Sequence, residues 1–418
     1  MSPDRAGTRA TGADAQRMIA ELRELAQLTG TDRGAQRVAW TDTWAKAREW
    51  ERGLLAELPV EVDVDEAGNL WATLPGTSPQ VLIIGSHIDS VPDGGWLDGC
   101  LGVISALEVL RALAASGTPP LTVKLVDWAD EEGARFGLSL MGSMAAAGQL
   151  DPDFVRSLRD VDGITAQDAL AAHGVDVDRM TDSRARLTDA VAYIELHIEQ
   201  GPVLEARDLP LGVVSGIYGA ERWTARFTGQ AAHAGSTPMD QRRDALSAAA
   251  RLALEVRSLA RTRGGVGTVG RIDAEPGIPT AVAGVASALV DQRHIDPGTL
   301  QELHRLAVAA SRSIASEEDV EVAWSPLFQV APITFDADMV QAAAQIVVSL
   351  QGVDMRLPSG PLHDAARVAE TGIRTVMLFV RSKRGLSHTR EEDTDETDLA
   401  LALAALERLV DFELRRPR

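Results

Sequence analysis

The chain has 418 residues, 45% of them hydrophobic, a length that suggests two domains with substantial cores. Its formal net charge of −20 argues against nucleic acid as a partner, because a phosphate backbone requires a basic face. Cys100 is the single cysteine, so an intramolecular disulfide is excluded. The N-terminal segment is polar, and no run approaches the roughly 18 apolar residues of a membrane span. We therefore expect a soluble, cytoplasmic protein without a membrane partner.

The first half of the chain predicts an α/β domain. Ala, Leu, Arg and Glu recur at helical spacing over 13–57, and 60–74 is typical of two short strands. Strand and helix then alternate over 81–148, with a crossover helix at 101–115, and this order favours parallel strand pairing. Residues 151–189 are more charged and predict a helical connection.

The pattern changes over 211–330, where strand, helix, strand, strand, helix and strand follow one another. This βαββαβ order matches a ferredoxin-like unit. Helix and strand alternate again afterwards, with a helix at 340–350 and a strand at 375–380. We therefore predict a catalytic domain made of 1–210 and 331–418, with a mixed, mostly parallel sheet flanked by helices, into which 211–330 is inserted.

Side chains that can bind metals follow four predicted strands. In an open α/β sheet, ligands gather in the crevice outside the carboxyl ends of the strands, so residues far apart in sequence can meet there. Several imidazoles and carboxylates that can bind metal, together with one adjacent carboxylate that is not needed as a ligand, are suited to metal-assisted hydrolysis. The sequence therefore predicts a dinuclear metal hydrolase. The side chains are His87 and Asp98 after 81–84, Glu131 and Glu132 after 121–128, His197 after 191–194, and His388 after 375–380.

Six longer segments make the chain similar to a known family. They are GSHIDSVPDGGWLDG (85–99), DEEGARFG (130–137), HIEQGPVLE (197–205), GQAAHAGSTPMDQRRDAL (229–246), DQRH (291–294) and GLSHT (385–389). With these segments the chain resembles the zinc-dependent aminoacylase and carboxypeptidase superfamily, in the branch of N-carbamoyl-L-amino-acid hydrolases and allantoate amidohydrolases. The resemblance implies that the inserted ferredoxin-like domain serves as a lid and as a dimerisation domain.

The resemblance also implies a centre with two divalent metal ions per subunit. Zinc is the first candidate, and manganese or cobalt are the alternatives. His87, Asp98 and His197 would hold one ion. Asp98, Glu132 and His388 would hold the other, so that Asp98 bridges the pair.

Further residues take roles in the reaction by the same resemblance. Glu131 would deprotonate the water between the metals and deliver the proton to the leaving nitrogen. Asp89 would fix the tautomer of the His87 imidazole. Gln200 would contact the amide or ureido group of the substrate. His233, on the inserted domain, would stabilise the developing oxyanion from the partner subunit of a homodimer.

Substrate recognition conforms less well to the family. Arg293 stands where the family has an arginine that pairs with the substrate carboxylate, a task that suits a planar guanidinium, and Gly360 lies in a substrate-binding loop. Four positions near these two residues differ from the family pattern. The segment at Thr280 lacks the family's asparagine, and Pro361 removes a backbone N–H donor. Leu362 stands in place of a glycine and Arg381 in place of a proline. We expect the anchoring of the substrate to depend more heavily on Arg293, with Arg381 either assisting or pointing to solvent. The residues at the altered positions are Thr280, Pro361, Leu362 and Arg381.

The predicted reaction is hydrolysis of a C–N bond in a small-molecule N-carbamoyl, ureido or amide compound. N-carbamoyl amino acids are the first candidate, allantoate-like ureido acids the second, and N-acyl amino acids or a specialised metabolite the third. A metal-dependent binding protein descended from a hydrolase is the non-enzyme alternative. Glu131 argues against that alternative, because binding alone does not need a base.

Other potential ligands have simpler interpretations. Cys100 is expected to be a small buried residue at the start of the crossover helix. His363 and Asp364 are expected to form a structural pair at the start of a helix. His173 and His304 are expected to lie at the surface.

Overall fold

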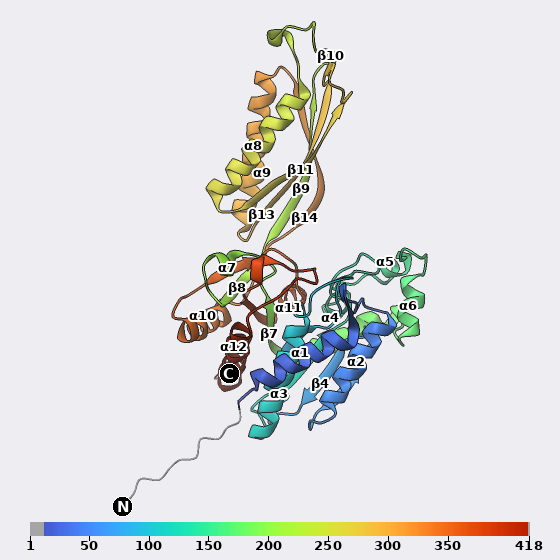
Figure 1. The fold of residues 1–418 in the computed structure, drawn as a ribbon, viewed down its shortest axis with the longest axis vertical. Helices are drawn as coiled ribbons and strands as arrows, with labels where there is room; N and C mark the ends of the chain where they lie inside the picture. Colours follow the sequence, from blue (N-terminus) through green and yellow to red (C-terminus); the bar gives the residue numbers. More distant parts are fainter. Residues whose placement is uncertain (1–11, 417–418) are drawn as a thin grey trace, which may run out of the picture. The chain divides into compact units, whose positions relative to one another are not determined.

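The computed structural model describes residues 12–416, which form two compact units (Figure 1). Unit 1 runs to Ser215 and resumes at Phe335, and unit 2 is Gly216–Thr334. These boundaries differ by a few residues from the expected 210/211 and 330/331. At the first boundary, residues 211–215 of β8 (Leu211–Ile217) belong to unit 1 because this strand pairs with a strand of the unit 1 sheet. The short strand β15 (Ile333–Thr334) pairs with the last residues of β8.

The unit 1 sheet has nine strands and a parallel centre. Its strand order is β15-β8-β17-β7-β5-β6-β4-β3, and β16 (Arg356–Ser359) also pairs with β8. The central strands β17, β7, β5 and β6 run parallel and are mostly buried, as expected for apolar strands covered on both faces. The mixed α/β fold predicted from the sequence is therefore confirmed. The bounds are β17 Arg374–Val380, β7 Ala190–Ile198, β5 Val81–His87, β6 Thr122–Trp128, β4 Leu70–Leu74 and β3 Glu61–Val64.

Helices flank this sheet. The predicted crossover helix is α3 (Cys100–Ser116), which is buried at every position from Cys100 to Leu110 and contacts β5, α1 and α12. In the described part of the chain, no helix is both long enough and apolar enough to cross a bilayer. The other helices are α1 Ala15–Thr29, α2 Asp42–Leu55, α4 Met141–Ala146, α5 Pro152–Ser157, α6 Ala166–Ala172, η1 Val177–Leu187, α7 Val203–Ala206, α10 Ala337–Gln351, α11 Asp364–Glu370, η3 Lys383–Gly385 and α12 Glu396–Arg415.

Unit 2 is a four-stranded antiparallel sheet with two helices packed against it (Figure 1). The strand order β11-β13-β9-β14 and the βαββαβ chain order are those of a ferredoxin-like unit. Helix α8 begins at Ala245, because the Asp244 side chain caps the N–H groups of Leu246 and Ser247. The bounds are β9 Gly219–Thr228, α8 Ala245–Arg263, β11 Val266–Glu275, β13 Val285–His294, α9 Pro297–Glu317 and β14 Glu321–Val330, with η2 at Met239–Gln241.

A buried carboxyl group on α2 makes the stability of unit 1 depend on pH. Glu51 is 1% exposed, and burial together with the nearby Asp127 carboxylate raises its pKa well above the usual value. A raised folded-state pKa stabilises the fold below the unfolded pKa of about 4.3, and this stabilisation is lost as the pH rises toward the folded pKa.

Glu51→Gln is therefore expected to unfold at a higher temperature than the wild type at about pH 8, and at nearly the same temperature at or below about pH 4. Glutamine keeps the shape of the protonated carboxyl group and cannot ionise. Calorimetric Tm values at the two pH values test this. An equal difference between the two proteins at both pH values would show that Glu51 does not titrate across this range.

Candidate metal centre

The five predicted metal-binding side chains meet at the carboxyl ends of the parallel strands. His87 ends β5, His197 lies at the end of β7, and Glu132 follows β6. Asp98 and His388 come from the loops before α3 and after β17. The ligating atoms of His87, Asp98 and His197 lie within 4.8 Å of one another, and so do those of Asp98, Glu132 and His388.

Asp98 lies between the two groups. Its Oδ1 is 3.1 Å from His197 Nε2 and 4.0 Å from His87 Nε2. Its Oδ2 is 3.3 Å from His388 Nε2, which is in turn 3.4 Å from Glu132 Oε2. Each oxygen of one carboxylate therefore faces a different group, which is the arrangement that a bridging ligand needs.

The donor atoms of this site fit a divalent cation. Among the described residues, the buried atoms Asp98 Oδ1, His197 Nε2 and Glu132 Oε1 make no well-directed hydrogen bond, although Asp98 Oδ1 and His197 Nε2 face each other at 3.1 Å. Leaving such an atom unsatisfied costs about 1–3 kcal/mol, and more where the group is charged. Imidazole and carboxylate are ligands that zinc and neighbouring transition metals accept. The clustered residues can therefore bind divalent metal.

The two histidines of the first group present the same ring nitrogen to the site. His87 Nδ1 lies 3.2 Å from the Asp89 carbonyl oxygen and 3.5 Å from Asp89 Oδ1. His197 Nδ1 lies 2.9 Å from the Ile198 carbonyl oxygen. A proton on each Nδ1 leaves the Nε2 lone pair directed at the site, the usual arrangement behind a metal-binding histidine.

Charge in the site is dominated by carboxylates. Burial alone would raise the pKa of Asp98, but the imidazoles of His197 and His388 hold it well below its usual value. The interaction with Asp98 raises the pKa of His388 to about 9, and burial followed by the Asp98 charge raises the pKa of Glu132 to about 7. A bound cation would replace protons on such groups, so its binding would release protons.

Glu131 is held beside the first group by the loop after β6. Asp89 Oδ1 and Oδ2 accept the backbone N–H groups of Glu131 (3.1 Å) and Glu132 (3.2 Å). Glu131 is 7% exposed, and its Oε2 lies 3.7 Å from His87 Nε2. Burial raises the pKa of Glu131 well above its usual value, against the opposing charge of His87. A carboxylate in this setting is suited to accept a proton at neutral pH.

Gln200 adjoins the second group. Its backbone φ of 55° is in the left-handed region, and its Nε2 donates to Asp98 Oδ2 (2.9 Å) and to Ser387 Oγ (3.2 Å). Nε2 also lies 3.3 Å from His388 Nε2. The side-chain oxygen of Gln200 is buried and has no hydrogen-bond partner among residues 12–416, so it is an available acceptor.

Two residues near His197 were not assigned to the site from the sequence. His363 stands at the start of α11, as expected, without a capping hydrogen bond from its side chain, but it is 1% exposed and its ring centroid is 4.5 Å from that of His197. Glu195 completes a third cluster with His197 and His363. Its carboxylate accepts from Ser86 Oγ (2.8 Å) and from the Ala365 N–H (3.1 Å), so it is already hydrogen-bonded. An acidic residue inside an apolar strand was the signal that could have revealed it.

The altered loops place their side chains differently from expectation. Arg381 donates from Nε to Asp398 Oδ2 (2.9 Å) and from a terminal nitrogen to Asp208 Oδ1 (3.0 Å), and its side chain is 17% exposed. Arg381 therefore neither points freely to solvent nor offers an unpaired charge to a substrate. Gly360 lies between β16 and α11 with room for a Cβ atom, and Leu362 is 36% exposed.

The isolated histidines are less exposed than expected. His173 is half-buried, with its ring centroid 5.6 Å from that of Trp44, and the ring of His304 stacks on Trp223 at 3.9 Å. Both take part in aromatic packing. Cys100 is fully buried, as expected, and burial raises the pKa of its thiol to about 11.

His233 and Arg293 lie at opposite ends of unit 2. His233 is exposed on β10 (Ala232–His233), which pairs with β12 (Ala281–Val282) beyond the far end of β13 (Figure 1). Arg293 is opposite Ala220 near the other end of β13, where its Nε donates to Asp291 Oδ1 (2.8 Å). The strand from Val285 to Arg293 alone spans about 27 Å at ~3.4 Å per residue.

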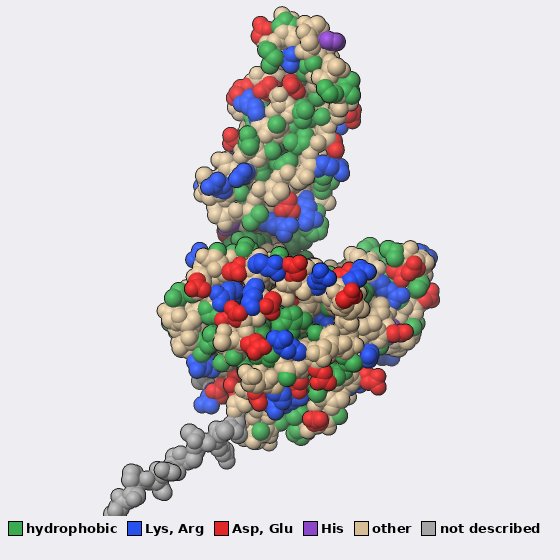
Figure 2. Space-filling view, viewed as in Figure 1, with side chains coloured by type: hydrophobic (Ala, Val, Ile, Leu, Met, Phe, Trp, Pro, Cys, Tyr) green, Lys and Arg blue, Asp and Glu red, His purple; other side chains and the backbone are tan. Residues whose placement is uncertain are grey.

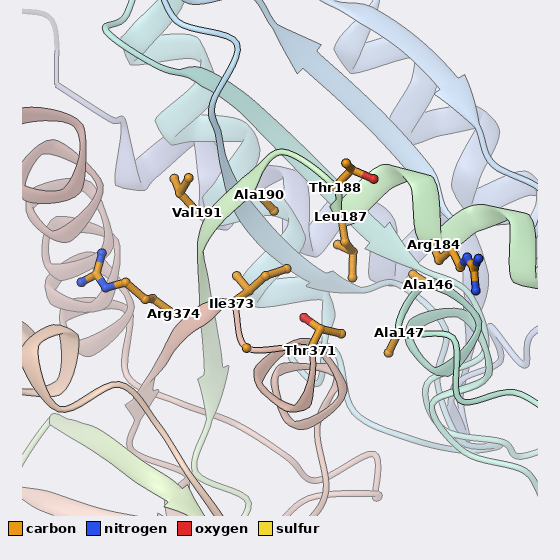
Figure 3. Close-up of a pocket in the computed structure, with 11 residues that line it drawn as sticks. Ala146, Ala147, Arg184, Leu187, Thr188, Ala190, Val191, Thr371, Ile373 and Arg374 are labelled. Atoms are coloured by element: carbon orange, nitrogen blue, oxygen red, sulfur yellow. The ribbon is translucent and has the colours of Figure 1, made fainter. Parts of the chain in front are cut away.

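A separate hollow of about 760 Å³ opens in unit 1 (Figure 3). It is lined by Ala190 and Val191 of β7 and by Arg374 of β17, at the amino ends of these strands. The metal-binding groups lie at the carboxyl ends, and none of their residues lines this hollow. It is therefore distinct from the site described above.

Comparisons with known proteins cover most of the chain. The profile of peptidase family M20/M25/M40 matches residues 83–411. An N-carbamoyl-L-amino acid amidohydrolase of Geobacillus stearothermophilus is 34% identical over 377 residues, covering 89% of this chain and 92% of the relative. An allantoate amidohydrolase of Escherichia coli K12 is 33% identical over 381 residues, covering 89% and 91%. The crystal structure of an amidase of the hydantoinase/carbamoylase family from Burkholderia multivorans superimposes with a TM-score of 0.85 at 31% identity, covering 98% of this chain and all of that one.

Proposed function

Because the chain belongs to peptidase family M20/M25/M40, we propose that it is a metal-dependent amidohydrolase acting on a C–N bond of a small acid. Its substrate is an N-carbamoyl, ureido or amide derivative of an amino acid or a related compound. The observation that carries this proposal is the pair of ligand groups that share Asp98, with the buried Glu131 beside them. The names of the relatives, which are carbamoyl-amino-acid and allantoate amidohydrolases, support the ureido class.

The proposed centre holds two divalent ions, with zinc as the first candidate and manganese or cobalt as alternatives. His87, Asp98 and His197 hold one ion. Asp98, Glu132 and His388 hold the other. Bound there, divalent cations polarise the substrate carbonyl and lower the pKa of water.

Glu131 moves the proton in the proposed reaction. Its carboxylate accepts a proton from the attacking water, whose oxygen forms a bond to the carbonyl carbon. The C–N bond then breaks, and Glu131 returns the proton to the departing nitrogen. The raised pKa of Glu131 lets it hold that proton between the two steps. Gln200 Oε1 is free to accept an N–H group of the amide or ureide, since Nε2 is bound to Asp98.

Arg293 is proposed to anchor the substrate carboxylate. Asp291 orients its guanidinium and also accepts from Arg222 Nε (2.8 Å), so two cationic side chains flank one carboxylate. Since Thr280, Pro361 and Leu362 alter the surroundings, ordinary N-carbamoyl amino acids and allantoate should be poor substrates with high KM. A bulkier or differently charged ureido or amide compound should be a better one.

A turnover screen tests the function. Protein reconstituted with Zn²⁺, Mn²⁺ or Co²⁺ is incubated with N-carbamoyl, ureido and N-acyl amino acids of increasing size, and release of free amine is measured. We expect turnover of at least one class that disappears in Glu131→Gln. Absence of turnover across the panel, in protein that binds metal, would contradict the proposed function. High kcat/KM on a simple N-carbamoyl amino acid would contradict only the altered-pocket proposal.

We further propose a homodimer in which His233 completes the active site of the partner subunit. The distance between His233 and Arg293 along β13 supports this proposal. Unit 2 of a single subunit cannot bring both residues to one small substrate. Apolar side chains near His233 support it as well, since Met239 is 77% exposed and Ile278 is 53% exposed. Exposed apolar groups of this kind are typical of an interaction surface. Figure 2 shows that acidic and basic side chains are instead interspersed over the visible face of unit 1.

Co-expression of His233→Ala with Arg293→Ala tests the dimer. Each variant alone is expected to be nearly inactive. The mixed dimer has one site with both residues intact if they come from different subunits, so about half of its sites should be active by the logic of a closed two-fold dimer. Purified mixed dimer without activity would show that both residues act from one subunit. A fully active wild-type monomer in light scattering would also contradict the proposal.

A further inference from the structure

One buried carboxylate connects the two loops that carry Asp98 and His388. Glu392 is 2% exposed and stands four positions after His388. Its Oε1 accepts the backbone N–H groups of Leu97 and Asp98, both at 3.0 Å. Its Oε2 accepts from Ser387 Oγ at 3.1 Å. Its own N–H donates to the Thr389 carbonyl oxygen (3.0 Å), a turn that directs the side chain back toward the site.

The same contacts continue to the carboxylate of Asp98. Ser387 Oγ, the partner of Glu392, is also 2.9 Å from Asp98 Oδ2. Gln200 Nε2 donates to both Ser387 Oγ and Asp98 Oδ2, so it closes a ring of polar contacts around that oxygen. The packing is tight as well, because a Cβ atom on Gly95 would lie 2.1 Å from the Glu392 carboxyl carbon.

Asp98 and His388 need such a connection. His87 and His197 are fixed by strands β5 and β7, whereas Asp98 and His388 lie in loops 290 positions apart in the chain. Side chains that bind a metal must be held close to their productive geometry, and loops hold them less well than strands. Within the described residues, Glu392 is bound to the backbone of one loop and to a side chain of the other.

We propose that Glu392 is a positioning residue that fixes Asp98 and His388 relative to each other, so that one carboxylate can serve both metal ions. The inference rests on the proposed function, since it takes Asp98 and His388 as metal ligands. Glu392 does not itself contact metal or substrate in this scheme. It acts through the Leu97–Asp98 backbone and through the Ser387 hydroxyl.

Metal affinity tests the inference without recourse to a substrate. Glu392→Ala should weaken Zn²⁺ binding by about 10–100-fold, the usual effect of removing a partner behind a metal ligand. Competition with a chromophoric chelator measures the dissociation constant, and the visible spectrum of the Co²⁺-loaded protein reports ligand geometry. Glu391→Ala is the matched control, because Glu391 is exposed and pairs with Arg384 (2.8 Å). This control should leave both readouts unchanged.

Two further variants separate positioning from general loss of structure. Glu392→Gln keeps an oxygen for the Leu97 and Asp98 N–H groups and an amide that can donate to Ser387, so it should restore affinity to within a few-fold of the wild type. Gly95→Ala displaces Glu392 without removing it, and should weaken Zn²⁺ binding as Glu392→Ala does.

Wild-type affinity in Glu392→Ala would overturn the inference while leaving the proposed function intact. Affinity in Glu392→Gln as low as in Glu392→Ala would also overturn it, because the hydrogen bonds would then not be the cause. Should Glu392→Ala fail to fold, Gly95→Ala and Glu392→Gln still decide the matter. A wild-type protein that binds no divalent metal would instead contradict the proposed function itself.

Discussion

Glu131→Gln is expected to lower kcat by about 10²–10⁴-fold, the usual contribution of a general base, while both metal ions stay bound. Glutamine has the shape of glutamate but cannot accept the proton of the attacking water. The backbone of residue 131 is held by Asp89, so the substitution should leave the loop and the neighbouring Glu132 in place. Steady-state kinetics together with elemental analysis of the same preparation provide the measurement.

Glu391→Gln serves as the control, because Glu391 is an exposed residue paired with Arg384. It should retain wild-type kcat. Loss of both metals in Glu131→Gln would make Glu131 a ligand and not the base. An unchanged kcat with both metals present would remove Glu131 from the reaction altogether.

Asp98→Asn is expected to abolish detectable turnover and to lower the metal content of the protein. One carboxylate faces His197 at 3.1 Å and His388 at 3.3 Å, so each of its two oxygens is directed at a different ligand group. An amide carries no charge, and its nitrogen cannot act as a ligand in place of the second oxygen. Without a bridging anion between them, the two cations would repel each other more strongly, so the second ion should bind less tightly. Elemental analysis after dialysis and the turnover screen above measure the two effects.

Asp93→Asn is the matched control for this change. Asp93 lies in the same loop, but it is partly exposed and pairs with Arg33 and Gln36 at the surface. It should keep both metals and full activity. Two metals per chain in Asp98→Asn, with activity near that of the wild type, would show that Asp98 does not bridge the ions.

The amino-acid sequence by itself determined the order of the elements and the position of the polar strand ends. Apolar runs such as 81–84 and 191–194 are buried in the parallel sheet, and the histidines that follow them lie at its carboxyl edge. A parallel strand that is buried on both faces consists of apolar residues. Polar side chains are therefore found at its end, where the chain leaves the buried sheet. The βαββαβ order of unit 2 could likewise be predicted from local sequence, because apolar residues recur with a different spacing in helices and in strands.

The tertiary structure alone decided which partners these residues have. Arg381 was open to two interpretations in the sequence, and its pairing with Asp398 and Asp208 depends on how α12 and the loop after α7 pack. Glu392, Ser387 and Glu195 were not identified for the same reason. Their roles come from contacts between segments far apart in the chain, and periodicity describes which face of an element is buried but not what lies against it. The assignment of residues 211–215 of β8 to unit 1 was likewise decided by strand pairing, because this part of β8 pairs antiparallel with β17.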